Sequence, residues 1–112
     1  MAKTVNINEN YIRNYIRKNR PPAEIRDQLD IGYSYKGETI EIYERRPIYS
    51  KKGAFQNLSY AKIKYVKTLK TWKLYWMRAS GKWQSYEPFS QSTHLEEILE
   101  IIDKDEYGCF KG

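Results

Sequence analysis

The sequence predicts an α+β fold: a five-stranded, mostly antiparallel sheet with an N-terminal and a C-terminal helix packed on one of its faces. Amphipathic stretches at helical spacing lie near both ends of the chain. Segments of alternating apolar and polar residues, separated by short turns, lie between them. Both helices need an apolar surface to cover, and an antiparallel sheet offers one while its other face stays in water. With 112 residues, the chain is predicted to form a single domain, residues 1–112.

The N-terminal helix is predicted to begin after Asn6, whose side chain caps it while Glu9 completes a capping box. Its apolar stripe consists of Ile7, Tyr11, Ile12, Tyr15 and Ile16. Pro21 ends the helix, because a proline disfavours the helical conformation in the residue before it. Pro22 suits the first turn of a short second helical segment, residues 23–28.

A β-hairpin follows, with strands on either side of a turn at Lys36-Gly37. A two-residue turn there pairs Tyr33 with Ile40 and Ile31 with Ile42, which places the large aliphatic side chains on one face. The opposite face collects Asp30, Gly32, Ser34, Thr39, Glu41, Tyr43 and Arg45.

Three further strands are predicted to form a meander after a basic loop at residues 47–58. They span residues 59–68, 71–78 and 82–87, the last two joined by a turn at Ser80-Gly81. The core face of this meander is predicted to hold Ile63, Tyr65, Leu69, Trp72, Leu74, Trp76 and Trp83. The open face is predicted to hold Lys62, Lys64, Val66, Lys73, Tyr75, Met77, Lys82, Gln84 and Tyr86.

The C-terminal helix is predicted from a second capping box, Thr93 with Glu96, and from an apolar stripe that follows it. Gly108 is the predicted stop. The stripe consists of Leu95, Ile98, Leu99, Ile101 and Ile102.

The distribution of charge and the cysteine content indicate which class of partner and which cellular compartment to expect. Residues 31–90 carry 12 Lys and Arg against four Glu, whereas residues 91–112 carry two Lys against six Asp and Glu. A basic middle favours a polyanionic partner. Cys109 is the one cysteine, which favours a reducing compartment, and no signal peptide or membrane span is recognised. A cytoplasmic location without membrane partners is expected.

A family resemblance rests on ordered clusters that cover nearly everything from Arg20 onward. The clusters are Arg20-Pro21-Pro22, Arg26-Asp27-Gln28-Leu29-Asp30-Ile31-Gly32-Tyr33, Tyr43-Glu44-Arg45-Arg46-Pro47, Trp72-Lys73-Leu74-Tyr75-Trp76-Met77-Arg78, Lys82-Trp83, Tyr86-Glu87-Pro88 and Asp105-Glu106-Tyr107-Gly108-Cys109-Phe110. On them the chain resembles a family of small bacterial proteins known as domain of unknown function 3024. The resemblance implies a bacterial origin and one compact domain, and it implies no activity.

The open face is where function is predicted. Lysines neutralise phosphates and tyrosine rings stack on bases, so the face is predicted to bind RNA or DNA. The candidate residues are Arg45, Lys62, Lys64, Lys73, Tyr75, Lys82 and Tyr86.

Three alternatives stay open. The same face, with Val66 and Met77, is also suited to a protein partner or a homodimer, and it is also what an ordinary solvated face looks like. The third alternative is a metal-dependent nuclease, in which Asp30 and Glu41 hold magnesium near Arg45 and Lys62 or Lys64. No catalytic or cofactor motif is recognised, and His94 and Cys109 are too few for a zinc site. No cofactor is therefore expected.

Overall fold

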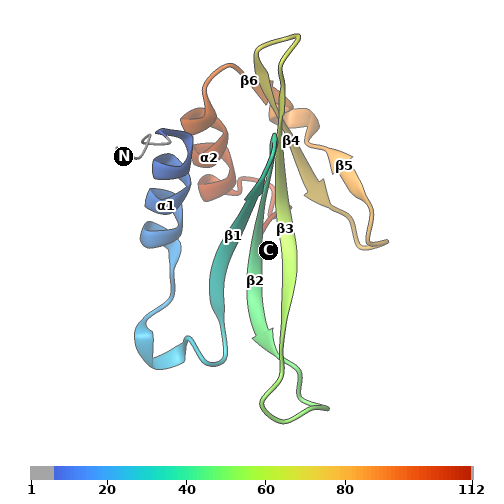
Figure 1. Cartoon of the computed structure of the whole chain (residues 1–112). Coiled ribbons are helices and arrows are strands. Elements are labelled where there is room, and N and C mark those ends of the chain that lie inside the picture. Colours follow the sequence, from blue (N-terminus) through green and yellow to red (C-terminus); the bar gives the residue numbers. More distant parts are fainter. Residues whose placement is uncertain (1–6, 112) are drawn as a thin grey trace.

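A computed structural model describes residues 7–111 as two layers, a sheet and two helices that pack on one of its faces (Figure 1). The elements are α1 (Ile7–Asn19), η1 (Ala23–Ile25), β1 (Asp30–Lys36), β2 (Thr39–Pro47), β3 (Phe55–Val66), β4 (Thr71–Met77), β5 (Trp83–Ser85), η2 (Glu87–Phe89), β6 (Gln91–Ser92) and α2 (Leu95–Lys104). The predicted α+β class, antiparallel pairing and terminal helices are confirmed. The predicted cap at Asn6 lies outside the described residues.

The five predicted strands lie in the order β1-β2-β3-β4-β5, and β6 adds a short sixth strand that pairs with β4. The β1–β2 register is shifted by two residues from the prediction, since the turn is Gly37-Glu38 and Tyr33 pairs with Ile42. Because side chains alternate with a period of two, this shift leaves every side chain on its predicted face.

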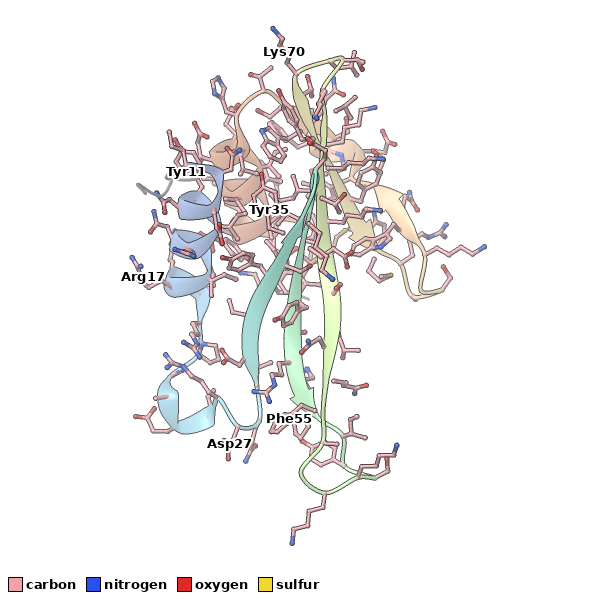
Figure 2. All side chains as sticks on the ribbon, viewed as in Figure 1. Tyr11, Arg17, Asp27, Tyr35, Phe55 and Lys70 are labelled. Carbon is pink, nitrogen blue, oxygen red and sulfur yellow. The ribbon has the colours of Figure 1, made fainter. Side chains whose placement is uncertain are left out.

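The core lies between the sheet and the two helices. Ile40, Ile42, Ile63 and Leu74 from the sheet are fully buried, and α1 contributes Ile12. From α2 come Leu95, Ile98, Leu99 and Ile102. Figure 2 shows Tyr35 projecting from the sheet toward α1, in keeping with its contact with the core.

A β-bulge brings a polar group into this core. β3 begins at Phe55, earlier than predicted, and its register against β2 shifts between Ile42 and Tyr43, where Ala61 and Ser59 are the successive partners. The residue between these partners, Tyr60, is therefore outside the ladder, and its ring is buried. Its hydroxyl lies 2.9 Å from that of Tyr15 on α1, so each buried hydroxyl has a partner.

This tyrosine pair predicts a loss of stability in alkaline solution. Burial raises the pKa of Tyr60 to about 12 and that of Tyr15 further still. In the unfolded chain both titrate near 10, so their contribution is fully present below pH 10 and is lost as the pH rises from about 10 toward 12. We expect the free energy of unfolding to fall by roughly 4 kcal/mol more, about 2 kcal/mol for each tyrosine, in the wild type than in Tyr15→Phe/Tyr60→Phe over that range. Equal losses in urea titrations at the two pH values would contradict this assignment.

The β4–β5 register differs from the prediction by one residue, and this reverses the faces of β5. Three residues, 79–81, separate Arg78 from Lys82, and Gly81 takes the positive φ of 84° that closes such a loop. Met77 therefore pairs with Trp83, which places Trp83 on the open face and not in the core. Tyr86 moves the opposite way: it is 2% exposed and packs against Phe110 with ring centroids 4.9 Å apart.

Three smaller predictions are also wrong. Leu69 is 56% exposed, because the last β3–β4 pair is Val66 with Thr71 and Leu69 lies in the turn. The cap of α2 is His94 and not Thr93, and its side chain makes no capping bond. The helix ends before Gly108, with Asp105 in the left-handed conformation at φ 45°.

No helix within residues 7–111 is long and apolar enough to cross a membrane.

Candidate nucleic-acid interface

We call the side of the sheet opposite the helices the open face. Two rows of side chains cross its centre, one residue from each successive strand. The first row is Ser34, Glu41, Lys62, Tyr75 and Ser85, and the second is Lys36, Thr39, Lys64, Lys73 and Gln91. Antiparallel pairing places neighbours within a row about 5 Å apart, so each row is a continuous strip.

Lys62, in the first row, lies close to two aromatic rings, Tyr75 in the same row and Trp83 on β5. Its ammonium nitrogen is 5.6 Å from the ring centroid of Tyr75 and 5.9 Å from that of Trp83. Both distances are within the range of cation–π attraction. Both rings are half-buried, so part of each ring surface faces solvent beside a positive charge.

The second row brings two lysines together. Lys64 and Lys73 are direct partners across β3 and β4, an arrangement in which like charges repel. None of the ion pairs among residues 7–111 involves Lys62, Lys64 or Lys73. The positive charge of these three lysines is therefore left to solvent or to a ligand.

The structure brings together four of the seven predicted site residues, namely Lys62, Lys64, Lys73 and Tyr75. Arg45 is on the open face but at its far end, where its guanidinium lies 4.0 Å from the ring centroid of Phe55 (labelled in Figure 2). Lys82 is exposed in the β4–β5 turn, outside the two rows, so its predicted place on the face is wrong. Tyr86 is wrong for the stronger reason that it belongs to the core.

Trp83 is the residue that the sequence prediction missed. Gly81 was the feature of the sequence that could have located it. A three-residue hairpin loop that ends with a glycine in the left-handed conformation gives a β4–β5 register different from that of a two-residue turn at Ser80-Gly81. With the longer loop, Trp83 falls beside Lys62 and takes the role predicted for Tyr86.

The carboxylates of the nuclease alternative are kept apart. Asp30 on β1 pairs with Arg45, which is four residues further along β2 than Glu41, so the two acidic residues are separated by roughly 13 Å along the strands. Asp30 also accepts two hydrogen bonds from Arg20, at 2.9 and 2.8 Å, which lower the pKa of its carboxyl group. Within the described residues, no group of three or more His, Cys, Asp or Glu is placed to hold a metal ion.

Cys109 and His94 lie away from the open face. Cys109 packs against the core beside Phe110, and burial together with the charge of Asp105 raises the pKa of its thiol, the opposite of what a reactive thiolate requires. His94 is exposed at the start of α2, 3.8 Å from the Glu96 carboxylate.

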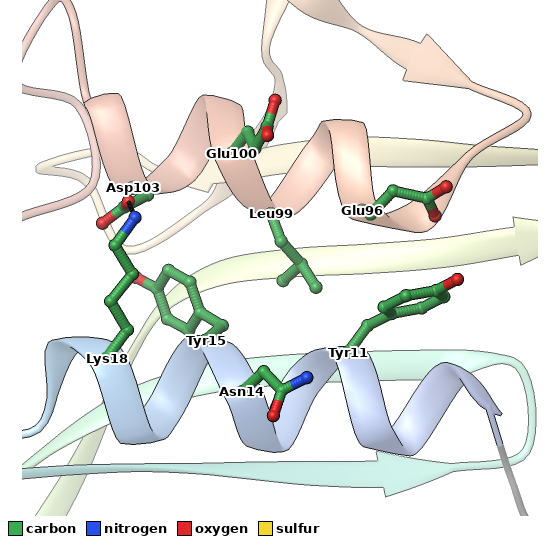
Figure 3. A pocket seen from close by; sticks show the side chains of 8 residues that line it. All are labelled: Tyr11, Asn14, Tyr15, Lys18, Glu96, Leu99, Glu100 and Asp103. Carbon is green, nitrogen blue, oxygen red and sulfur yellow. Dashed lines mark hydrogen bonds and ion pairs between the residues drawn. The ribbon is translucent and has the colours of Figure 1, made fainter.

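A hollow lies on the helix side, between α1 and α2 (Figure 3). It measures about 200 Å³; Tyr11, Tyr15 and Leu99 line it, and a 2.7 Å ion pair from Lys18 to Asp103 crosses one end. Glu96 and Glu100 also line it. Its carboxylates repel a polyanion, so the basic open face is the better candidate for binding one.

The fold and the open face define a small two-layer α+β protein with one sheet face covered by helices and the other exposed and basic. The chain belongs to the family described as Domain of unknown function (DUF3024), which it matches over residues 2–112. Comparisons with curated proteins and with solved structures found no match.

Proposed function

We propose that the open face binds single-stranded nucleic acid, RNA or DNA. The observation that supports this proposal is the group of three lysines from the two adjacent rows, Lys62, Lys64 and Lys73, which make no ion pair with the described residues and lie next to the partly exposed rings of Tyr75 and Trp83. Lysines neutralise phosphates, while aromatic rings on a sheet stack on unpaired bases. A duplex keeps its bases stacked and paired, so it would leave the rings unused.

The two rows have different roles in this proposal. Lys64 and Lys73, one on each of two adjacent strands, hold neighbouring phosphates and are relieved of their mutual repulsion. Tyr75 of the first row and Trp83, beside that row on β5, stack on bases, and the ammonium group of Lys62 lies near both rings. The hydroxyls of Ser34 and Ser85 offer hydrogen bonds along the first row.

A cytoplasmic bacterial setting is part of the proposal. A single, partly buried cysteine suits a reducing compartment. Single-stranded RNA is abundant there, so RNA is the partner we propose to test first.

A protein partner is the competing occupant of the same face. Met77, the cross-strand neighbour of Trp83, adds apolar surface that such a partner would use. Pairing this face with a second copy of itself would bring two sets of lysines together, which opposes a homodimer. An acidic protein is thus the alternative, and nuclease treatment would leave its association unchanged.

The aromatic residues give the first test. We expect Tyr75→Ala and Trp83→Ala each to weaken binding of a short fluorescent single-stranded RNA by about fivefold to a hundredfold, because stacking contributes roughly 1–3 kcal/mol per base. Fluorescence anisotropy at low salt measures this.

The matched control is Tyr49→Ala, since Tyr49 is 88% exposed in the β2–β3 loop and lies outside the two rows. This variant should bind as the wild type does. Absence of binding by the wild type at low salt, or equal weakening in all three variants, would refute the proposal.

A further inference from the structure

Four arginines surround a second hollow, on the other side of the sheet from the open face. The hollow measures about 290 Å³ and lies where α1, η1 and β1 meet; Figure 2 shows Arg17 on the lower half of α1, above the η1 segment. Its lining residues are Arg13, Ile16, Arg17, Arg20, Arg26 and Tyr33. The charged groups among them are all positive.

The local sequence explains how the arginines converge. Arg13, Arg17 and Arg20 follow each other at spacings of four and three, which places them on one side of α1 and its C-terminal end. The chain then turns back through η1, which adds Arg26 from the opposite side. The helix dipole favours a cation in the last turn, which accounts for Arg17 but not for Arg13, a turn earlier, or Arg26, outside the helix.

Two of the guanidinium groups are fixed by carboxylates that do not line the hollow. Arg20 makes a bidentate contact with Asp30 at 2.9 and 2.8 Å. Arg13 contacts Glu9 at 3.3 Å and the Tyr33 hydroxyl at 3.4 Å. These two arginines therefore already have partners within the protein.

The other two are the groups available to a ligand. Arg26 donates from Nε to the carbonyl oxygen of Pro21 at 2.8 Å, which orients the side chain and leaves its two terminal nitrogens as donors. Among the residues that the structure describes, Arg17 donates to the amide oxygen of Asn14 alone, at 3.3 Å. Neither makes an ion pair with another of the described residues.

We propose that this hollow binds a phosphate group, either as inorganic phosphate or as a small phosphate monoester. Arginine forks match phosphate oxygens two at a time, and a doubly charged phosphate is the ligand that best offsets several guanidinium groups. A volume of about 290 Å³ is at the small end of ligand pockets, which favours a ligand of that size. The hollow is a different site from the open face, because Tyr33, which lines the hollow, projects from the helix-covered face of the sheet.

The test is a titration of ¹⁵N-labelled protein with inorganic phosphate and, separately, with ribose 5-phosphate, at constant ionic strength, followed through the arginine Nε–Hε NMR signals. We expect saturable shifts for one or both probes in the wild type. The variant Arg17→Gln/Arg26→Gln should bind the same probe at least about tenfold more weakly, since each charge-assisted hydrogen bond contributes substantially to the free energy of binding. Arg13 and Arg20 are left intact because they hold Glu9 and Asp30.

The matched control is Lys51→Gln/Lys52→Gln, which removes the same charge from the exposed β2–β3 loop and should bind as the wild type does. A third arm uses an oligonucleotide with hydroxyl ends, which carries diesters only. No saturation by either probe in the wild type, equal weakening in the two double variants, or an effect of the arginine pair on the oligonucleotide alone would each overturn the proposal. Lys62→Gln/Lys64→Gln/Lys73→Gln should retain phosphate binding whether or not the open face binds nucleic acid.

Discussion

Trp72→Ala is expected to lower the free energy of unfolding by about 3–5 kcal/mol, the usual cost of truncating a buried tryptophan. Trp72 is 6% exposed on the helix-covered side of β4, and its ring centroid is 4.7 Å from that of Tyr65. Small domains have a total stability of about 5–15 kcal/mol, so this loss is a large part of the whole. Equilibrium unfolding in urea measures it.

Trp83→Ala is the matched control, because it removes the same side chain from the opposite face of the same sheet. We expect it to cost about 1 kcal/mol or less, as for most substitutions away from the core. Trp76 lies on the core side, as predicted, but is half-buried, so its truncation should fall between the two. Equal midpoints for the Trp72 and Trp83 variants would contradict this assignment of the two faces, and a larger loss in the Trp83 variant would reverse it.

The largest expected effect on function comes from Lys62→Gln/Lys64→Gln/Lys73→Gln. Removing three charges from the two adjacent rows should weaken binding of single-stranded RNA at low salt by about tenfold or more, because phosphate contacts supply most of a non-specific affinity. The fold should be preserved, since these side chains point away from the core and make no ion pair with the described residues. Circular dichroism checks the fold.

A second triple variant tests whether the loss of affinity depends on where the lysines lie or only on the net charge of the protein. Lys51→Gln/Lys52→Gln/Lys104→Gln removes the same charge from the β2–β3 loop and the end of α2, at exposed positions outside the two rows. We expect it to lose little affinity. An equal loss in both triple variants would show that binding depends on net charge and not on the open face.

The order and type of the main elements were predictable from the sequence, because hydrophobic spacing is unambiguous in the helices and in β1, β2 and β4. The β1–β2 register was predicted two residues out, and the faces survived because the side-chain period is also two. The β4–β5 register was one residue out, and the same periodicity then exchanged Trp83 and Tyr86 between the faces.

Other features depend on contacts that no local pattern carries. Tyr60 enters the core through a bulge, and its burial is made possible by the hydroxyl of Tyr15, 45 residues away in the chain. The arginine hollow likewise needs η1 to turn Arg26 toward α1. For the candidate site, the lysines of β3 and β4 were predictable from alternation alone, whereas the second aromatic ring depended on the length of one turn.

The salt dependence of RNA binding tests the central claim, that the open face binds single-stranded nucleic acid through its lysines, most directly. Each phosphate contact on a single strand contributes about 0.7 to the slope of log affinity against log salt concentration. Replacing Lys62, Lys64 and Lys73 with glutamine should therefore reduce the magnitude of that slope by about 2, while the control triple variant keeps the wild-type slope. The same slope in the wild type and in the open-face variant would contradict the claim.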